Sequence, residues 1–147
     1  MAKEKFEIEN QIGFNLHRVT TLYRRKLIQT LQDYKLTPEQ WQILNILWKS
    51  ETLSTSKIAE FTMQDLPSTL RSLQRLEAKD YIQKETDTKD KRIQIWKTTK
   101  QGKFLQKILP NLLLTSFEKY LDGFPKQKLN QINLNLIELL DFLLSKN

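Results

Sequence analysis

Residues 36–102 constrain the fold of this chain more than any other stretch. Their hydrophobic periodicity predicts two short helices joined by a tight turn, followed by a hairpin of two strands with a basic tip. The second helix, residues 65–79, has a leucine stripe formed by Leu66, Leu70, Leu73 and Leu76. Another stripe carries three cations and no acids, and consists of Ser68, Arg71, Ser72, Arg75 and Lys79. A helix that buries leucine and presents arginine and hydroxyl groups suits the major groove of DNA.

Several helix starts can be read from capping residues. Thr37 is suited to cap a helix that runs to about Lys49, because Pro38 fits its first position and Gln40 can bond back to the cap. Ser54 or Thr55 is expected to cap a short helix that ends near residue 61. The helix of residues 65–79 follows after a turn, with Asp65 at its start and Pro67 in its first turn.

The remaining segments extend this pattern on both sides. Two strands are expected at residues 81–86 and 92–97, since Ile93 and Ile95 alternate with Gln94 and Trp96. A helix over residues 7–34, about 40 Å long, is too long for so small a domain to cover. Thr99 is expected to cap a helix that is interrupted or kinked near Pro110 and ends near Tyr120, and residues 126–145 form the last helix.

Composition sets limits on the function. The 147 residues are enough for one domain, contain no cysteine, and carry a net charge of +7. Residues 65–107 hold eleven cations against six acids, which favours a polyanionic partner. No apolar run is long enough to span a membrane and no signal sequence is evident, so a cytoplasmic protein is expected. His17 is the single histidine and no glycine-rich phosphate loop is present, so we expect no enzyme, no catalytic residue, no cofactor and no metal site.

The order and spacing of these features resemble the MarR family of transcriptional regulators, which are dimeric winged helix-turn-helix proteins. The residues that carry the resemblance are 36–41, 58–60, Arg71 with residues 76–77, the wing tip 90–92, and residues 99–102. Three positions depart from the family pattern: Asp80 stands where a glycine is usual, Lys89 where arginine is frequent, and Pro67 lies within the first turn of the second helix. The resemblance implies a single mainly α domain, residues 1–147, with a small β-wing. Its winged helix-turn-helix would be residues 36–99, and its dimerisation helices residues 1–35 and 100–147.

By this resemblance the second helix of the motif enters the major groove and the wing lies at the minor groove. The expected recognition-helix contacts are Gln64, Ser68, Thr69, Arg71, Ser72 and Arg75. The expected wing contacts are Lys89, Lys91 and Arg92, with Asp90 bracing Arg92 through a salt bridge. Arg71 can read guanine with two parallel hydrogen bonds, and the alternative is that it contacts only phosphate.

We therefore expect a homodimer that binds double-stranded DNA at an inverted repeat, with recognition helices about 34 Å apart. The resemblance implies a repressor that a small-molecule effector releases. By resemblance, an effector pocket would lie near His17, Arg18, Thr37 and Trp41, and the alternative is that Trp41 is an ordinary core residue. Two other functions fit the same pattern: an architectural winged-helix protein without sequence preference, or a protein-interaction module. A monomer whose long helices fold back on themselves is the alternative to the dimer.

Overall fold

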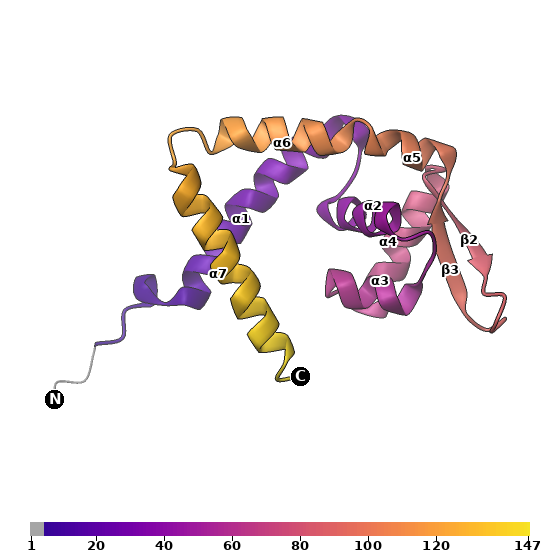
Figure 1. Cartoon of the computed structure of the whole chain (residues 1–147), viewed down its shortest axis with the longest axis horizontal. Helices are drawn as coiled ribbons and strands as arrows, with labels where there is room; N and C mark the ends of the chain where they lie inside the picture. The colour runs from indigo at the N-terminus through magenta and orange to yellow at the C-terminus, as the bar shows by residue number, and fades with distance from the viewer. Residues whose placement is uncertain (1–4) are drawn as a thin grey trace. The chain divides into compact units, whose positions relative to one another are not determined.

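The computed structural model describes residues 5–147, which are mainly helical with one small antiparallel sheet (Figure 1). The predicted fold class, mainly α with a small β-wing, is confirmed. The chain divides into two compact units, Met1–Leu113 and Leu114–Asn147. The first unit contains η1 (Ile8–Asn10), α1 (Ile12–Leu31), η2 (Gln32–Tyr34), α2 (Pro38–Lys49), β1 (Leu53–Ser54), α3 (Thr55–Thr62), α4 (Leu66–Ala78), β2 (Ile82–Thr86), β3 (Gln94–Thr98) and α5 (Lys100–Gln106). Helix α6 (Leu109–Tyr120) crosses the boundary, and α7 (Lys126–Leu144) lies in the second unit.

Helix α2 starts and ends where the sequence predicts. The hydroxyl of Thr37 accepts a hydrogen bond from the Gln40 amide at 3.1 Å, and the Gln40 side chain accepts one from the Thr37 amide at 3.2 Å. This reciprocal pair satisfies two donors that the helix start would otherwise leave unpaired. Ile43, Leu44 and Leu47 point into the core, so α2 forms the centre of the first unit.

The predicted helix of residues 7–34 is shorter than expected. Its α-helical part is Ile12–Leu31, flanked by the short 3₁₀ turns η1 and η2. Extended backbone at Gln11 separates η1 from α1, and a left-handed conformation at Lys35, with φ of 53°, ends η2. At 1.5 Å per residue α1 is therefore about 30 Å long rather than 40 Å.

The sheet has three strands in the order β1-β3-β2, all antiparallel. Strand β1 is not predicted by the sequence pattern, because two residues are too few to show an alternation. The alternation in β3 is present, but its buried face carries Trp96 and Thr98, while Ile93 and Ile95 are exposed or half-buried. Trp96 can be buried because its indole N–H donates to the Thr55 hydroxyl at 2.9 Å.

A close backbone contact joins α5 to the start of β2. The Thr99 hydroxyl caps α5 by accepting from the Gly102 amide at 3.1 Å, and it donates to the Asp80 carbonyl at 2.6 Å. A Cβ placed on Gly102 would lie only 2.0 Å from the Tyr81 carbonyl oxygen, so this position requires glycine. Asp80 adopts a φ of 62°, in the left-handed region that glycine enters most readily and that aspartate tolerates better than most other residues.

The helix predicted after Thr99 is interrupted near Pro110, one of the two forms expected, and is therefore two helices. The chain leaves the helical path after α5, and α6 restarts at Leu109 with Pro110 as its second residue. Proline has no amide hydrogen and its ring clashes with the carbonyl four residues earlier, so the break falls just before it. The last predicted helix is confirmed as α7, and none of its residues is buried within the described part of this chain.

Candidate nucleic-acid interface

The α3–turn–α4 motif is built by two side-chain caps and one left-handed residue. The Ser54 hydroxyl accepts from the Lys57 amide at 3.2 Å and starts α3. Met63 ends α3 with a φ of 56°, which turns the chain toward α4. The Asp65 carboxylate then starts α4 by accepting from the Ser68 amide at 2.7 Å and the Ser68 hydroxyl at 2.9 Å.

Asp65 is held in its charged form at the start of α4. The Ser68 amide lowers the pKa of Asp65 first, followed by the Ser68 hydroxyl, with a smaller contribution from the charge of Arg71. A carboxylate is also favoured at a helix N-terminus by the orientation of the peptide dipoles. These hydrogen bonds fix the N-terminal end of α4, which is the end predicted to contact bases.

Most of the expected recognition-helix residues are accessible. Arg71 and Arg75 are exposed, and Gln64, Ser68 and Ser72 are half-buried. The Arg71 guanidinium donates to the Ser68 hydroxyl at 3.0 Å, which orients it along the helix surface. Helix α4 thus presents two arginines and two hydroxyl groups on adjacent surface positions.

Thr69 is an exception among these residues, because it is fully buried. Its hydroxyl donates to the Asp65 carbonyl at 2.8 Å, and its side chain shares the inner face of α4 with Leu73 and Leu76. The predicted contact between Thr69 and DNA is therefore wrong. The predicted leucine stripe is also wrong in its first half, since Leu66 and Leu70 are exposed.

Lys79 does not belong to the exposed cationic stripe either. Its ammonium group donates to the Lys35 carbonyl and lies 3.5 Å from the Gln40 side-chain oxygen. Burial lowers the pKa of Lys79, and the nearby charges of Lys35 and Arg75 lower it further. Lys79 thus joins the end of α4 to the turn that precedes α2.

The wing is the hairpin of β2 and β3, which extends beyond the helices of the first unit (Figure 1). Lys89, Lys91 and Arg92 are all exposed near its tip. The Arg92 guanidinium donates two hydrogen bonds of 3.0 Å to the Asp90 carboxylate, and the Arg92 amide donates a third. The Arg92 guanidinium, and next the Arg92 amide, lower the pKa of Asp90, while this carboxylate raises the pKa of Arg92. Lys97 and Glu85 form an ion pair farther along the hairpin.

The four residues of the expected effector pocket already have local roles or face solvent. His17 and Arg18 are exposed on α1, where the Arg18 guanidinium lies over the Phe14 ring at 5.3 Å. The Thr37 hydroxyl is used in the capping box, and Trp41 packs edge-to-face on Trp48 with ring centroids 5.7 Å apart. The alternative interpretation of Trp41, a structural aromatic residue, agrees with this contact.

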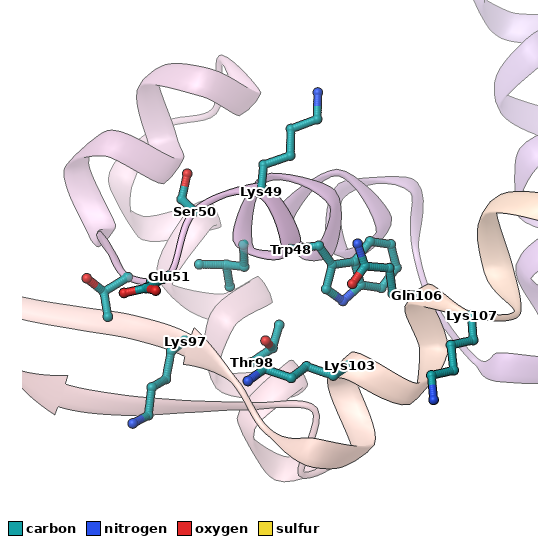
Figure 2. A pocket seen from close by; sticks show the side chains of 11 residues that line it. Trp48, Lys49, Ser50, Glu51, Lys97, Thr98, Lys103, Gln106 and Lys107 are labelled. Atoms are coloured by element: carbon teal, nitrogen blue, oxygen red, sulfur yellow. The ribbon is translucent and has the colours of Figure 1, made fainter.

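A hollow of about 580 Å³ lies elsewhere, between the end of α2, the end of β3, and α5 (Figure 2). It is lined by Leu47, Trp48, Lys49, Ser50, Glu51, Thr52, Lys97, Thr98, Lys103, Gln106 and Lys107. The Trp48 indole donates to the Gly102 carbonyl at 2.9 Å and ties its α2 wall to its α5 wall. None of the four residues expected at an effector pocket lines this hollow.

Other kinds of site are not indicated by the described part of the chain. Within residues 5–147, no three or more histidine and acidic side chains converge on a possible metal position. None of the helices within the same residues has the length and apolar character needed to cross a membrane.

Comparisons with known proteins agree with this geometry. Residues 36–94, from the start of α2 into β3, match the model of the MarR family. The chain is 26% identical over 120 residues to the HTH-type transcriptional regulator SarZ of Staphylococcus aureus, covering 82% of this chain and 81% of SarZ.

Two solved structures share the fold. One is BpsR of Bordetella bronchiseptica, with a TM-score of 0.84, 21% identity, and coverage of 93% of this chain and 98% of BpsR. The other is a MarR variant from E. coli in complex with operator DNA, with a TM-score of 0.82, 19% identity, and coverage of 94% and 99%. On the family match and the shared fold, the winged helix-turn-helix of this chain, residues 36–94, is that of the MarR family of transcriptional regulators.

Proposed function

We propose that this regulator is a homodimeric repressor that binds an inverted-repeat operator through α4 and the wing. The observation that carries the proposal is the exposed cationic surface of α4, next to a wing with three further exposed cations. Arginine at these positions supplies both phosphate neutralisation and a planar donor for base edges.

Base reading is assigned to the N-terminal half of α4, which enters the groove first in this motif. The residues in or just before that half are Gln64, Ser68, Arg71 and Ser72. Arg75 lies one turn farther along α4, where we assign it a contact with phosphate rather than with a base. Arg71 carries the main base contact because Ser68 holds its guanidinium on the exposed face. The alternative role of Arg71 is phosphate contact alone, which would give affinity without sequence preference.

The wing supplies a second contact. Three exposed cations of the wing can reach the DNA backbone or the minor groove: Lys89, Lys91 and Arg92. The hydrogen bonds to Asp90 orient the Arg92 side chain and leave it exposed. Neutralising phosphates with these cations releases counterions, so the affinity should fall steeply with salt.

Dimerisation is assigned to α1, α6 and α7, which correspond to the expected segments 1–35 and 100–147. Large apolar side chains are exposed on these helices, and they include Val19, Leu22, Ile28, Leu114, Ile132, Leu136 and Ile137. Apolar surface of this extent on a soluble protein commonly marks an interface between proteins. A second copy would cover it with an isologous interface and would place two α4 helices on successive turns of DNA.

Release by an effector is the last part of the proposal. The DNA binding of BpsR is described as regulated by 6-hydroxynicotinic acid. For the present chain we infer regulation by a small molecule whose chemical identity is open. Because His17 and Arg18 are exposed on α1, a pocket that uses them with Thr37 and Trp41 needs a further wall from a second copy.

The decisive experiment is selection of bound fragments from a random DNA pool, followed by binding of the consensus and of an unrelated duplex. A palindromic consensus supports the proposed repressor. Absence of a consensus would favour the architectural alternative, and absence of salt-dependent binding would favour a protein-interaction module. Arg71→Ala is expected to cost about 1–3 kcal/mol on the consensus and to relax the preference at one base pair. An equal loss on both duplexes would show that Arg71 contacts phosphate alone.

A further inference from the structure

An apolar surface lies between the start of α4 and the base of the wing. Leu66, Leu70 and Ile93 are 53%, 37% and 39% exposed, although leucine and isoleucine at such spacing are usually buried. Together with Pro67 they line a hollow of about 690 Å³. Its remaining walls are polar or cationic and consist of Ser54, Thr55, Ser56, Arg92 and Gln94.

The position of this hollow on α4 is informative. Thr69, Leu73 and Leu76 form the buried face of the helix, and Arg71 lies on the exposed face. At 3.6 residues per turn, Leu66 and Leu70 fall on the flank between these two faces. They therefore lie to one side of the face that carries Arg71 and are left uncovered by the rest of the first unit.

The surroundings of the hollow indicate which partner covers it. Among residues 5–147 no acidic side chain lines it, and Arg92 contributes a cation from the wing side. Three hydroxyl-bearing residues at the start of α3 add hydrogen-bonding groups to its rim. An apolar floor with a cationic and hydroxylic rim complements DNA, whose major groove presents thymine methyl groups between two rows of phosphates.

We propose that Leu66 and Leu70 read thymine by apolar contact with its 5-methyl group, beside the base pair contacted by Arg71. This inference rests on the proposed function and adds a specificity that the arginines and serines cannot supply, because hydrogen-bonding groups do not recognise a methyl group. Ile93 forms the far wall of the same hollow and limits how deeply the base edge enters. The operator is accordingly expected to carry thymine at one or two fixed positions in each half-site.

The test replaces single thymines of the selected operator by deoxyuridine, which pairs identically and lacks only the methyl group. Binding is measured by fluorescence anisotropy at one fixed salt concentration. With wild-type protein we expect about a fourfold loss of affinity for each contacted methyl, the value for removing one buried carbon from an apolar contact. At the other thymines we expect no change.

The same substitutions are then measured with Leu66→Ala/Leu70→Ala. Because both side chains are exposed, this variant should fold normally, which circular dichroism checks. It should bind the thymine operator more weakly and lose its sensitivity to deoxyuridine. Phe61→Ala is the matched control, since Phe61 is 58% exposed on α3, lies outside the proposed dimerisation helices and does not line the hollow.

The outcomes separate this inference from the proposed function. If the wild type selects a palindrome but no deoxyuridine substitution weakens binding, methyl reading is refuted and the repressor proposal stands. If sensitivity to deoxyuridine persists in the double variant, the assignment to Leu66 and Leu70 is refuted. If no sequence is preferred at all, the proposed function fails and this inference fails with it.

Discussion

Gly102→Ala tests whether the contact between α5 and β2 determines the stability of the winged domain. An added Cβ would lie 2.0 Å from the Tyr81 carbonyl oxygen and 3.3 Å from the Thr98 Cβ, and a Cβ essentially never approaches another atom closer than 3.0 Å. Both atoms near the Cβ belong to well-anchored segments, so α5 must move by about 1 Å. Forced overpacking of this kind costs about 1–3 kcal/mol.

Two further effects modify this cost. Movement of α5 also stretches the hydrogen bond from the Trp48 indole to the Gly102 carbonyl, 2.9 Å long, which contributes about 0.5–1.5 kcal/mol. Alanine has a higher helix propensity than glycine, which stabilises the folded state by about 1 kcal/mol and offsets part of this cost. The expected result is a net decrease of about 2 kcal/mol in the free energy of unfolding.

Gly13→Ala is the matched control, because Gly13 also lies in a helix but a Cβ added there would meet no atom of residues 5–147 within 4 Å. Within one protomer only the conformational gain applies here, and we expect an increase of about 0.4–1 kcal/mol in the free energy of unfolding. The assay is urea unfolding followed by circular dichroism at equal protomer concentrations, since dimerisation would make the stability depend on concentration. If both substitutions shifted the urea midpoint in the same direction, the reasoning about the Tyr81 contact would be refuted.

Three further predictions concern the interface and the α1–α2 contact. Arg92→Ala should weaken operator binding and reduce the slope of log affinity against log salt by about one unit in titrations at several salt concentrations, and an unchanged slope would exclude wing contact. Burial alone would raise the pKa of Glu39, but hydrogen bonding to Arg24 and the charge of Arg24 help to leave this pKa below its ordinary 4.5. The stabilisation by Glu39 should therefore be complete above pH 4.5 and disappear as the pH falls through the lowered pKa, so Glu39→Gln should flatten this part of the pH dependence of the urea midpoint. Thr69→Val should lower the free energy of unfolding by about 1 kcal/mol, because the hydrogen bond from the Thr69 hydroxyl to the Asp65 carbonyl is lost. The DNA consensus selected by this variant should match that of the wild type, and a different consensus would show that Thr69 does contact a base.

The elements that the sequence predicts well are those whose ends depend on local chemistry. Thr37, Asp65 and Thr99 each cap a helix by accepting from an amide three residues later, as their positions predict. Such contacts involve only neighbours in the sequence, so no knowledge of the tertiary fold is needed to identify them. The same reasoning explains why the bounds of α2 and α4 agree closely with expectation.

The errors concern which face of an element is buried. Leucines at 66, 70, 73 and 76 fit helical spacing, but so does the buried set of Thr69, Leu73 and Leu76. A threonine can occupy the core because its hydroxyl bonds within its own helix, and this option is invisible in a hydrophobicity pattern. Strand β1 and the burial of Trp96 likewise depend on pairing between segments about forty residues apart.

The contacts within the first unit also indicate how a signal at α1 could reach the recognition helix. Arg24 of α1 donates to Glu39 of α2 at 2.6 Å, directly beside the capping box. Gln40 of that box faces Lys79, which also donates to the Lys35 carbonyl at the end of η2. A shift of α1 that moved the first turn of α2 would therefore change the surroundings of Lys79 and the position of the α4 C-terminus. Arg24, Glu39, Gln40 and Lys79 thus form a continuous series of polar contacts from α1, through the first turn of α2, to the end of α4.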